Sequence, residues 1–330
     1  MMTRAILFLF LFFFIRSALA LTWSTDEHRQ VLELHGKLQQ EFGALGYQQG
    51  YRAESFGGNS QASLGLSGAG RLNSNLILIG EMSWDLISDS RYGDRIYADE
   101  VWLGVRIKNA LELTVGRSDS PFNQLTDMTD VFNLFGGYAY LIDHTLDDQL
   151  KVTWAKDGLD VRAGYAFNDA NKQDNNSGTE SQHGVSAGYQ ADNGLGLVLA
   201  VENKQLGAPN GDIRNMAAGV SYRTPGGFYA ALTRGRADYQ DVCWAGPECI
   251  DRFRFDYWEG VVSYSLKKVA FGLGYNRLSL HEPARERWED KVIFATEYYL
   301  LPKAKVYAEY LLNRAEGEDN LYGVGLQYYF

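Results

Sequence analysis

The sequence predicts an all-β fold, a transmembrane antiparallel β-barrel of about 16 strands. Three observations predict it. Many segments alternate apolar and polar side chains, the connectors between them alternate between short and long, and after the N-terminal region no apolar run is long enough for a membrane helix. Gly (35) and Tyr (21) are frequent and Pro (6) is rare, which suits many strands joined by tight turns.

The first 20 residues have the pattern of an export signal. An apolar run from Ala5 to Ile15 follows one basic residue, and the small residues Ala18 and Ala20 form a cleavage pattern. The run is well short of the roughly 20 residues that a spanning helix needs, which disfavours an uncleaved anchor. We therefore expect residues 1–20 to be a signal peptide and residues 21–330 to form a single exported domain.

The alternation is visible in single segments. Residues 195–202 put leucine and valine on one face and mostly small or polar side chains on the other, and residues 321–330 divide in the same way. A soluble secreted β-sandwich or barrel would also alternate and is the competing interpretation. Aromatic residues near the expected strand ends favour the membrane barrel, because membrane interfaces hold such rings. These residues are Tyr222, Tyr264, Tyr298 and Phe330.

Connector lengths differ between the two ends of the expected barrel. The short connectors are 72–75, 107–110, 156–159, 192–195, 224–227, 266–268 and 301–303. The long ones are 43–59, 88–94, 118–147, 169–180, 205–212, 238–252 and 281–286. Short turns at one end and long loops at the other are typical of an outer-membrane barrel.

Charge and cysteine usage exclude other classes of protein. The formal net charge of -10 and the pI of about 5.1 argue against a nucleic-acid partner. Cys243 and Cys249 flank a Gly-Pro turn in "CWAGPEC" and are expected to form a disulfide in an oxidising compartment, with free thiols as the alternative. The five histidines are scattered and none stands beside these cysteines, so we expect no metal and no cofactor.

A long irregular insert, residues 118–147, interrupts the regular pattern, and long loops without structure of their own are usually functional. Its centre reads "TDMTDVFNLFGG", residues 126–137. An irregular backbone cannot lie against lipid but can lie in a water-filled lumen. An external surface loop is the alternative, which the aromatic residues Phe132, Phe135, Tyr138 and Tyr140 disfavour.

Four stretches resemble the general diffusion porins of Gram-negative bacteria. "TWSTDEHRQVLELHGKL", with Gly36 and Lys37, is similar to the beginning of that family's first strand, and "SLGLSGAGRLNSNLILIGEMSW" resembles its second hairpin. "VGRSDSPFNQLTDMTDVFNLFGG" resembles the strand and third loop that follow, and the final "YYF" is similar to its aromatic end. The likeness extends over essentially all of the mature chain. It implies a sixteen-stranded barrel in the bacterial outer membrane, reached by export through the periplasm.

The resemblance also implies a constriction. In this family the third loop folds into the lumen, which gives residues 126–137 that role. Asp130 matches the family's acidic loop residue, Asp127 is a further candidate beside it, and the family's second acidic position falls on Leu134. The loop motif consists of Phe135, Gly136 and Gly137.

The wall opposite that loop departs from the family, which usually sets arginines there. The matching positions are Ser63, Glu100, and Thr145 or Asp147, while Lys37 remains.

Strand parity adds further charges to the lumen. It points Arg162 inward, together with Glu81, Asp85 and Glu100. Each charge alone is equally consistent with an ordinary solvated residue, but their sum is negative, and acidic groups at a constriction attract cations. The sequence predicts a water-filled passive diffusion channel for small hydrophilic solutes and ions with a preference for cations, and not an enzyme.

Two other functions remain as alternatives. A substrate-selective channel of the sugar type needs a track of aromatic residues, for which Tyr138, Tyr140, Trp102 and Tyr329 are candidates. An outer-membrane barrel hydrolase needs a nucleophile and a base that converge. His183 is the one residue considered for that chemistry, and nothing in the sequence orders it with a serine and an acid.

Partners follow from the resemblance alone. It implies a homotrimer surrounded by outer-membrane lipids and lipopolysaccharide, and a barrel-assembly machinery that recognises the C-terminal Phe330. The family's second long loop latches onto a neighbouring subunit, but the matching segment here, residues 86–100, is short.

Overall fold

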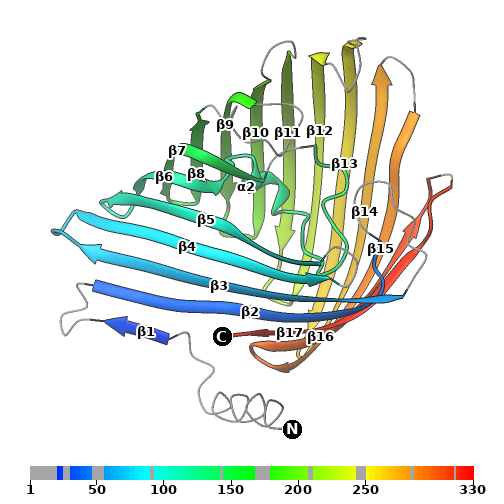
Figure 1. Cartoon of the computed structure of the whole chain (residues 1–330), viewed down its shortest axis with the longest axis horizontal. Coiled ribbons are helices and arrows are strands. Elements are labelled where there is room, and N and C mark those ends of the chain that lie inside the picture. The colour runs from blue at the N-terminus through cyan, green and yellow to red at the C-terminus, as the bar shows by residue number, and fades with distance from the viewer. Residues whose placement is uncertain are drawn as a thin grey trace.

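The computed structural model describes residues 21–24, 30–46, 56–89, 93–141, 144–167, 179–206, 211–242, 250–282, 286–315 and 317–330. The strands of this part form one sheet of 17 strands (Figure 1). Each strand from β2 to β17 pairs antiparallel with the next, and β17 returns to pair with β2. The predicted closed barrel of 16 strands is confirmed.

The strands are β1 (Leu21–Ser24), β2 (Gln30–Ala44), β3 (Gly57–Arg71), β4 (Leu76–Asp89), β5 (Gly93–Ile107), β6 (Leu111–Asp119), β7 (Thr145–Lys156), β8 (Leu159–Ala166), β9 (Thr179–Gln190), β10 (Leu195–Leu206), β11 (Asp212–Arg223), β12 (Phe228–Val242), β13 (Ile250–Leu266), β14 (Val269–Glu282), β15 (Glu286–Leu301), β16 (Ala304–Asn313) and β17 (Leu321–Tyr329).

Side chains alternate between the lumen and the outer surface. In β10, Leu197 and Leu199 are exposed on the outside, while Val198 and Ala200 are buried on the inside. Successive residues of a strand point to opposite faces, so the apolar half of each predicted segment becomes a surface for lipid. No described helix has the length and apolar character that a membrane crossing requires.

Tight turns connect consecutive strands at one end of the barrel. Asp157 and Gly158 join β7 to β8 with φ values of 52° and 84°, the left-handed conformation that two-residue hairpin turns use. A side chain at Gly158 would meet the carbonyl oxygen of Gln190 at 2.5 Å, so this position requires glycine. The seven predicted short connectors all lie between consecutive strands at this end.

Several strands run further toward the other end than the alternation predicts. The predicted loop 238–252 is shortened because β12 ends at Val242 and β13 begins at Ile250. Likewise, β4 ends at Asp89 and β5 begins at Gly93, within the predicted loop 88–94. Beyond the apolar band both faces of a strand can meet water, so no alternation marks where pairing stops.

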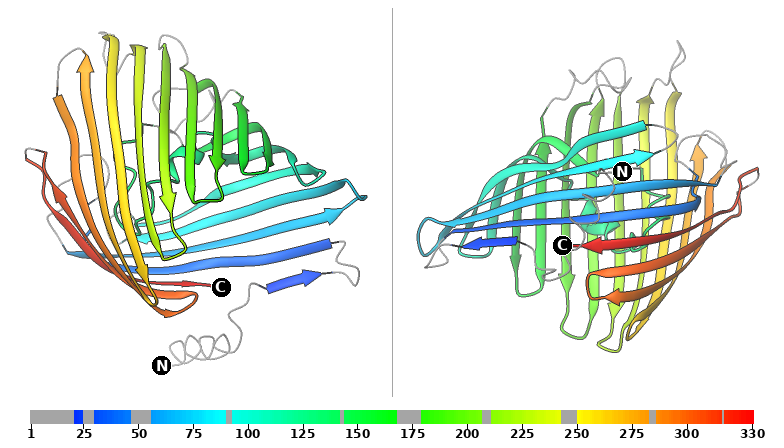
Figure 2. Two further views of the ribbon diagram at one scale, coloured as in Figure 1. Left: turned by 180° about the vertical axis from the view of Figure 1, so that it is seen from behind. Right: turned by 60° about the horizontal axis from the view of Figure 1, so that its bottom comes forward.

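The barrel closes beside the C-terminus. The Gly36 N–H donates to the Phe330 carbonyl at 3.2 Å, and the Phe330 N–H donates to the Gly36 carbonyl at 3.0 Å. Next along β2, residues 31–34 pair with β1, which lies beside β2 near the C-terminus in Figure 2. β1 is not predicted by the sequence, because four residues are too few to show an alternation.

Candidate functional site

The segment between β6 and β7 folds into the barrel, as predicted for the insert (Figure 1). Its short helix α2 (Asn123–Thr126) lies against β9, β10 and β11. Phe122 and Leu125 are fully buried and belong to one apolar cluster with Val198 and Ala200 of the wall. This apolar contact inside the lumen rules out the alternative of an external surface loop.

Glycines on the inner wall make room for the large side chains of the loop. A Cβ at Gly274 of β14 would lie 2.5 Å from the Phe132 ring, and one at Gly219 of β11 would lie 2.6 Å from the Met128 sulfur. A Cβ at Gly323 of β17 would lie 2.8 Å from a methyl carbon of Leu134. Side chains at these positions would force the loop side chains, above all the Phe132 ring, to shift.

Two buried wall carboxylates bind the backbone of the loop. Glu309 of β16 accepts hydrogen bonds from the N–H groups of Asn133, Leu134 and Phe135 at 2.6, 3.1 and 3.1 Å. Glu259 of β13 accepts hydrogen bonds from the Ala139 N–H at 2.9 Å and from the Thr129 hydroxyl at 3.0 Å.

A third carboxylate acts at the start of the loop, where Glu202 of β10 accepts a hydrogen bond from the Ser120 hydroxyl at 2.6 Å. Glu202, Glu259 and Glu309 are loop anchors that the sequence did not predict. The available signal was an acidic residue on the lumen face of a strand whose inward neighbours are mostly small or apolar.

The Phe-Gly-Gly motif lies directly before a turn at residues 138–139 of the loop. Phe135 is buried against Ile293 and Leu311 of the wall. A Cβ at Gly136 would lie 2.7 Å from the Asp130 carboxylate, and Gly137 has a φ of 63°. The backbone conformation of Gly137 favours glycine, and a side chain at Gly136 would require the Asp130 carboxylate to shift.

The open face of the loop is acidic. Asp127 and Asp130 are both exposed to the lumen, yet enough protein surrounds them that partial desolvation raises the pKa of each carboxyl. Arg162 and His144 act in the opposite direction on the pKa of Asp127. Leu134, the position at which the resemblance implies a second acid, packs against Gly323 of the wall.

Across the lumen, β4 and β5 carry the predicted carboxylates. Glu81 lies 3.1 Å from the His35 ring, the Ser63 hydroxyl donates to Asp85, and Glu100 accepts a hydrogen bond from the Trp102 indole at 3.1 Å. Cross-strand register places Asp85 beside Ser63 and Glu81 beside Ser67, on the same face as Lys37.

A neighbouring carboxylate, Asp99, was missed. The register of β4 and β5 shifts so that Ser83 faces both Asp99 and Glu100. Such a bulge turns two consecutive residues toward one side, and Asp99 comes close enough to Asp85 and Glu100 to interact with them electrostatically. Strict parity would have turned Asp99 outward.

Two arginines on this side of the lumen form ion pairs. Arg162 forms an ion pair with Asp160 at 2.7 Å. Arg117, which the sequence analysis did not consider, forms one with Asp147 at 2.8 Å and also donates to the carbonyls of Ala98 and Asp99. Lys37 stands on the inner face of β2, opposite Ser63.

Two of the four candidate aromatic residues are engaged in contacts of the loop with the wall. Tyr140 is buried under the loop, where its hydroxyl contacts Thr129 at 2.5 Å and Thr233 at 2.7 Å. Tyr138 lies beneath the Lys291 ammonium, 4.4 Å from its ring centre. His183 lies beside Asn203 and stacks on Tyr165, which is exposed on the outer surface, so it is not part of a site in the lumen.

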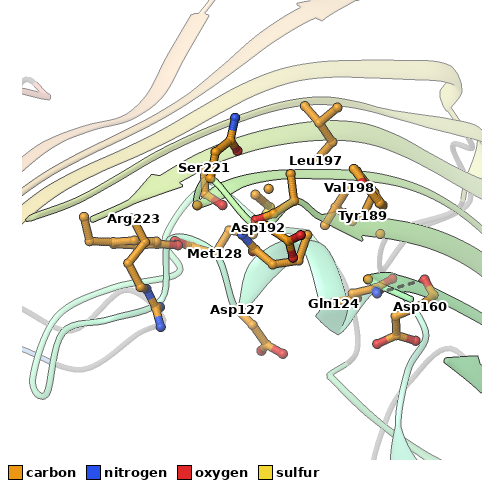
Figure 3. A pocket seen from close by; sticks show the side chains of 18 of the residues that line it. Gln124, Asp127, Met128, Asp160, Tyr189, Asp192, Leu197, Val198, Ser221 and Arg223 are labelled. Carbon is orange, nitrogen blue, oxygen red and sulfur yellow. Dashed lines mark hydrogen bonds between the residues drawn. The ribbon is translucent and has the colours of Figure 1, made fainter. Parts of the chain in front are cut away.

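An open cavity of about 870 Å³ lies between the helical part of the loop and the wall of β8–β12. Figure 3 shows Asp127 and Gln124 on the loop side of this space and Asp160, Ser221 and Arg223 on the wall side. Polar groups thus border the space next to the acidic face of the loop. Cys243 and Cys249 lie outside the described residues.

Comparison with known proteins identifies what this barrel is similar to. Residues 30–320 match the model of a family described as Gram-negative porin. Among solved structures, OmpF of Salmonella typhi in complex with daunomycin is similar with a TM-score of 0.78 and 14% identity, covering 93% of this chain and 100% of that one.

Two further structures show the same fold. A loop L8 deletion mutant of OmpT, an outer membrane protein of Vibrio cholerae, has a TM-score of 0.73 and 20% identity, covering 92% of this chain and 100% of its own. An anion-selective porin from Comamonas acidovorans has a TM-score of 0.70 and 14% identity, covering 91% and 100%. No curated protein matches the sequence significantly.

Proposed function

This chain belongs to the Gram-negative porin family and is an outer-membrane channel, and we propose that it lets small hydrophilic solutes and ions diffuse passively, cations more readily than anions. The family and the fold point to a channel rather than an enzyme. The cation preference rests on the charges that border the passage.

The observation that carries the proposal is the excess of acidic over basic side chains that border the passage. Arg117 of β6 and Arg162 of β8 are each in an ion pair with a carboxylate. Asp127 and Asp130 face the lumen from the loop, and a second acidic group faces it from β4 and β5. That group, which we call the acidic wall cluster, consists of Asp85, Asp99 and Glu100.

Acidic groups on both sides of a narrow passage raise the local concentration of cations and repel anions. Screening limits each charge to about 8 Å at physiological ionic strength, so only groups that border the passage matter. The fold alone does not set the sign of selectivity, since a structural neighbour of similar fold is described as anion-selective.

The test is the reversal potential of the refolded protein in a planar bilayer that separates two KCl concentrations. We expect a stable open current whose reversal potential has the sign of cation selectivity and shrinks as ionic strength rises. Anion selectivity would overturn the charge assignment and leave the channel in place.

We also propose that the protein forms a homotrimer through the outer face of β3–β6. A shallow apolar groove there is bordered by Leu66, Gly68, Leu78, Met82 and Leu103, and small residues between apolar ones suit close contact between membrane proteins. One structural neighbour from Vibrio cholerae is described as a trimer form. Chemical cross-linking in mild detergent tests this, and a strictly monomeric protein would contradict it.

We propose that residues 1–20 are removed as a signal peptide, that Cys243 and Cys249 are bonded, and that the assembly machinery recognises Phe330. The mass of the mature protein before and after reduction tests the first two. Loss of the folded form on deletion of Phe330 tests the third.

A further inference from the structure

The cavity of about 870 Å³ between α2 and the wall of β8–β12 extends to the short turns, and we call it the inner cavity. Its lining includes Gly158, Asn193 and Pro225, which belong to three of these turns. In outer-membrane barrels the short turns face the periplasm, so a solute that passes the loop inward reaches this space next. The volume is within the range of about 300–1,000 Å³ that is typical of small-molecule sites.

Small residues of the wall create the space. Gly188 of β9, Gly196 of β10 and Ser221 of β11 all line it. A Cβ at Gly188 would lie 2.6 Å from the Gln124 amide nitrogen, and one at Gly196 would collide with the Ser221 hydroxyl. Larger side chains at these two positions would therefore fill the space beneath α2 or displace the helix.

One side of the inner cavity carries a guanidinium group in a fixed position. Arg223 of β11 lies over the ring of Tyr229, its register partner on β12, 5.0 Å from the ring centre. The Tyr229 hydroxyl donates to the Met128 carbonyl of the loop at 2.7 Å, which holds the ring in place. Within the described part of the chain, Arg223 forms no ion pair with a carboxylate. Its N–H groups remain available to bind one.

The other side of the cavity carries a net negative charge. Asp127 of the loop and Asp160 of β8 both line it. Arg162 forms an ion pair with Asp160 at 2.7 Å and also interacts electrostatically with Asp127, so two carboxylates share one arginine. Gln124 donates to the Asp160 carbonyl at 3.1 Å, while its side-chain oxygen is buried without a partner among the described residues. An ammonium group would find a carboxylate and a free amide oxygen on this side.

The two charged sides lie some distance apart. β8 and β11 are three strands apart in the ring, which corresponds to about 14 Å at the usual strand spacing. Figure 3 shows the Asp127 and Arg223 side chains pointing the same way, away from the wall strands, at separate places along the cavity. An α-amino acid carries both charged groups on one carbon atom and cannot reach both sides. An extended tripeptide is about 10 Å long, and the long Arg223 side chain can cover the rest.

We propose that the inner cavity binds short zwitterionic peptides, with the peptide carboxylate on Arg223 and the ammonium group beside Asp127. The inference rests on the proposed function, because that function brings diffusing solutes to this site. A zwitterion has no net charge, so the acidic groups of the passage do not by themselves concentrate it. The cavity is open, so we expect weak binding, which also allows the peptide to leave toward the periplasm.

The test titrates triglycine against the current through single refolded channels and takes the dissociation constant from the concentration dependence of the current reduction. Two analogues each lack one charged end. N-acetyl-triglycine has no ammonium group, and triglycine amide has no carboxylate. The first variant is Arg223→Gln. Its matched control is Arg214→Gln, which removes the same charge from the outer face of the same strand.

We expect the dissociation constant of triglycine to rise about fivefold or more in Arg223→Gln, because a charge-assisted pair of hydrogen bonds is lost, and to stay unchanged in Arg214→Gln. The constant of triglycine amide should not rise in either variant, since this analogue has no carboxylate. An unchanged constant for triglycine in Arg223→Gln would overturn the proposal. An equal rise for triglycine and its amide would also overturn it, because Arg223 would then act only by supporting Tyr229 against the loop.

A second variant tests the other end of the peptide. Asp127→Asn should weaken the binding of triglycine and of triglycine amide but not that of N-acetyl-triglycine, which has no ammonium group to lose. Unchanged binding of triglycine would overturn the role of Asp127. A conducting, cation-selective wild-type channel that does not bind triglycine would overturn this inference alone, whereas the absence of any conducting channel would overturn the proposed function as well.

Discussion

The two walls of the lumen use carboxylates in different ways. On the wall of β9–β17, Glu259 and Glu309 are buried and their oxygens bind backbone N–H groups of the loop. On the wall of β2–β8, Asp85 and Glu100 are only partly buried and stay next to the passage. The same residue type thus fixes the loop on one side and sets the electrostatic potential of the passage on the other. The difference lies in whether the backbone of the loop covers the carboxylate.

The largest expected effect follows from removing one anchor. Glu309→Gln replaces an acceptor of three backbone N–H groups by an amide that offers one oxygen and its own donors. Each buried donor left without an acceptor costs about 1–3 kcal/mol, so we expect a loss of about 3 kcal/mol and a lower midpoint of thermal unfolding at a fixed scan rate. Single-channel current should also become larger and noisier.

The control for this change is Glu112→Gln on β6, in the wall of β2–β8. Glu112 forms a partly exposed ion pair with Arg106 at 2.6 Å, and such pairs contribute less than about 1 kcal/mol. Equal destabilisation by both substitutions would contradict the division between the two walls.

A second prediction concerns the space for the loop. Gly274→Ala puts a methyl group 2.5 Å from the Phe132 ring, and overpacking of this kind costs about 1–3 kcal/mol. Gly70→Ala is the matched control, since nothing lies within 4 Å of a Cβ there. We expect the unfolding midpoint of Gly274→Ala to be lower than that of the wild type and the midpoint of Gly70→Ala to be unchanged. The loss of the compact form on heating measures both midpoints.

A third prediction concerns a change in ion selectivity that leaves the stability of the fold nearly unchanged. Neutralising the acidic wall cluster with Asp85→Asn, Asp99→Asn and Glu100→Gln should reduce the cation-to-anion permeability ratio severalfold, because its charges lie within a screening length of the passage. The unfolding midpoint should change less than in Glu309→Gln. An unchanged reversal potential would show that the cluster does not border the conducting path.

The smallest expected effect is a pH dependence that arises from the loop. Desolvation raises the pKa of Asp127 and Asp130, so on acidification they become neutral before ordinary carboxylates with a pKa near 3.9. Cation preference should begin to fall at a correspondingly higher pH. The variant Asp127→Asn with Asp130→Asn should show a smaller early component than the wild type in a series of reversal potentials.

Acidification should affect the stability of the fold in the opposite direction. A carboxyl whose pKa is higher in the folded protein than in the unfolded chain opposes folding while it is ionised, and this cost disappears as the pH falls through the raised pKa. The loop should therefore not loosen over the range in which selectivity declines. Loosening there, seen as increased current noise, would contradict the assignment to Asp127 and Asp130.

The barrel could be predicted from the sequence because its cause is local. Every second residue of a segment such as β10 meets lipid, and a contrast with period two is visible in the sequence itself. The ends of β12 and β13 could not be predicted, because water lies on both sides of the strands there. The Phe-Gly-Gly loop could be located because an irregular backbone is tolerated only in the lumen.

The contacts that position the loop could not be predicted in the same way. Glu309 lies 176 residues from Asn133 along the chain, and nothing local distinguishes it from another lumen acid. The inward turn of Asp99 depends on a bulge opposite Ser83, which parity cannot reveal. The glycines at 219, 274 and 323 are visible in the sequence, but their purpose requires knowledge of what lies across from them.

The three anchors of the loop also have a mechanical consequence. A closed ring of strands joined only to their neighbours can flatten into an ellipse without breaking many hydrogen bonds. Here Ser120 binds β10, Thr129 binds β13 and Asn133 binds β16, so one short segment links strands that are not adjacent in the ring. Flattening the ring would stretch these links, and lateral pressure from the bilayer should therefore change the bore of the channel little.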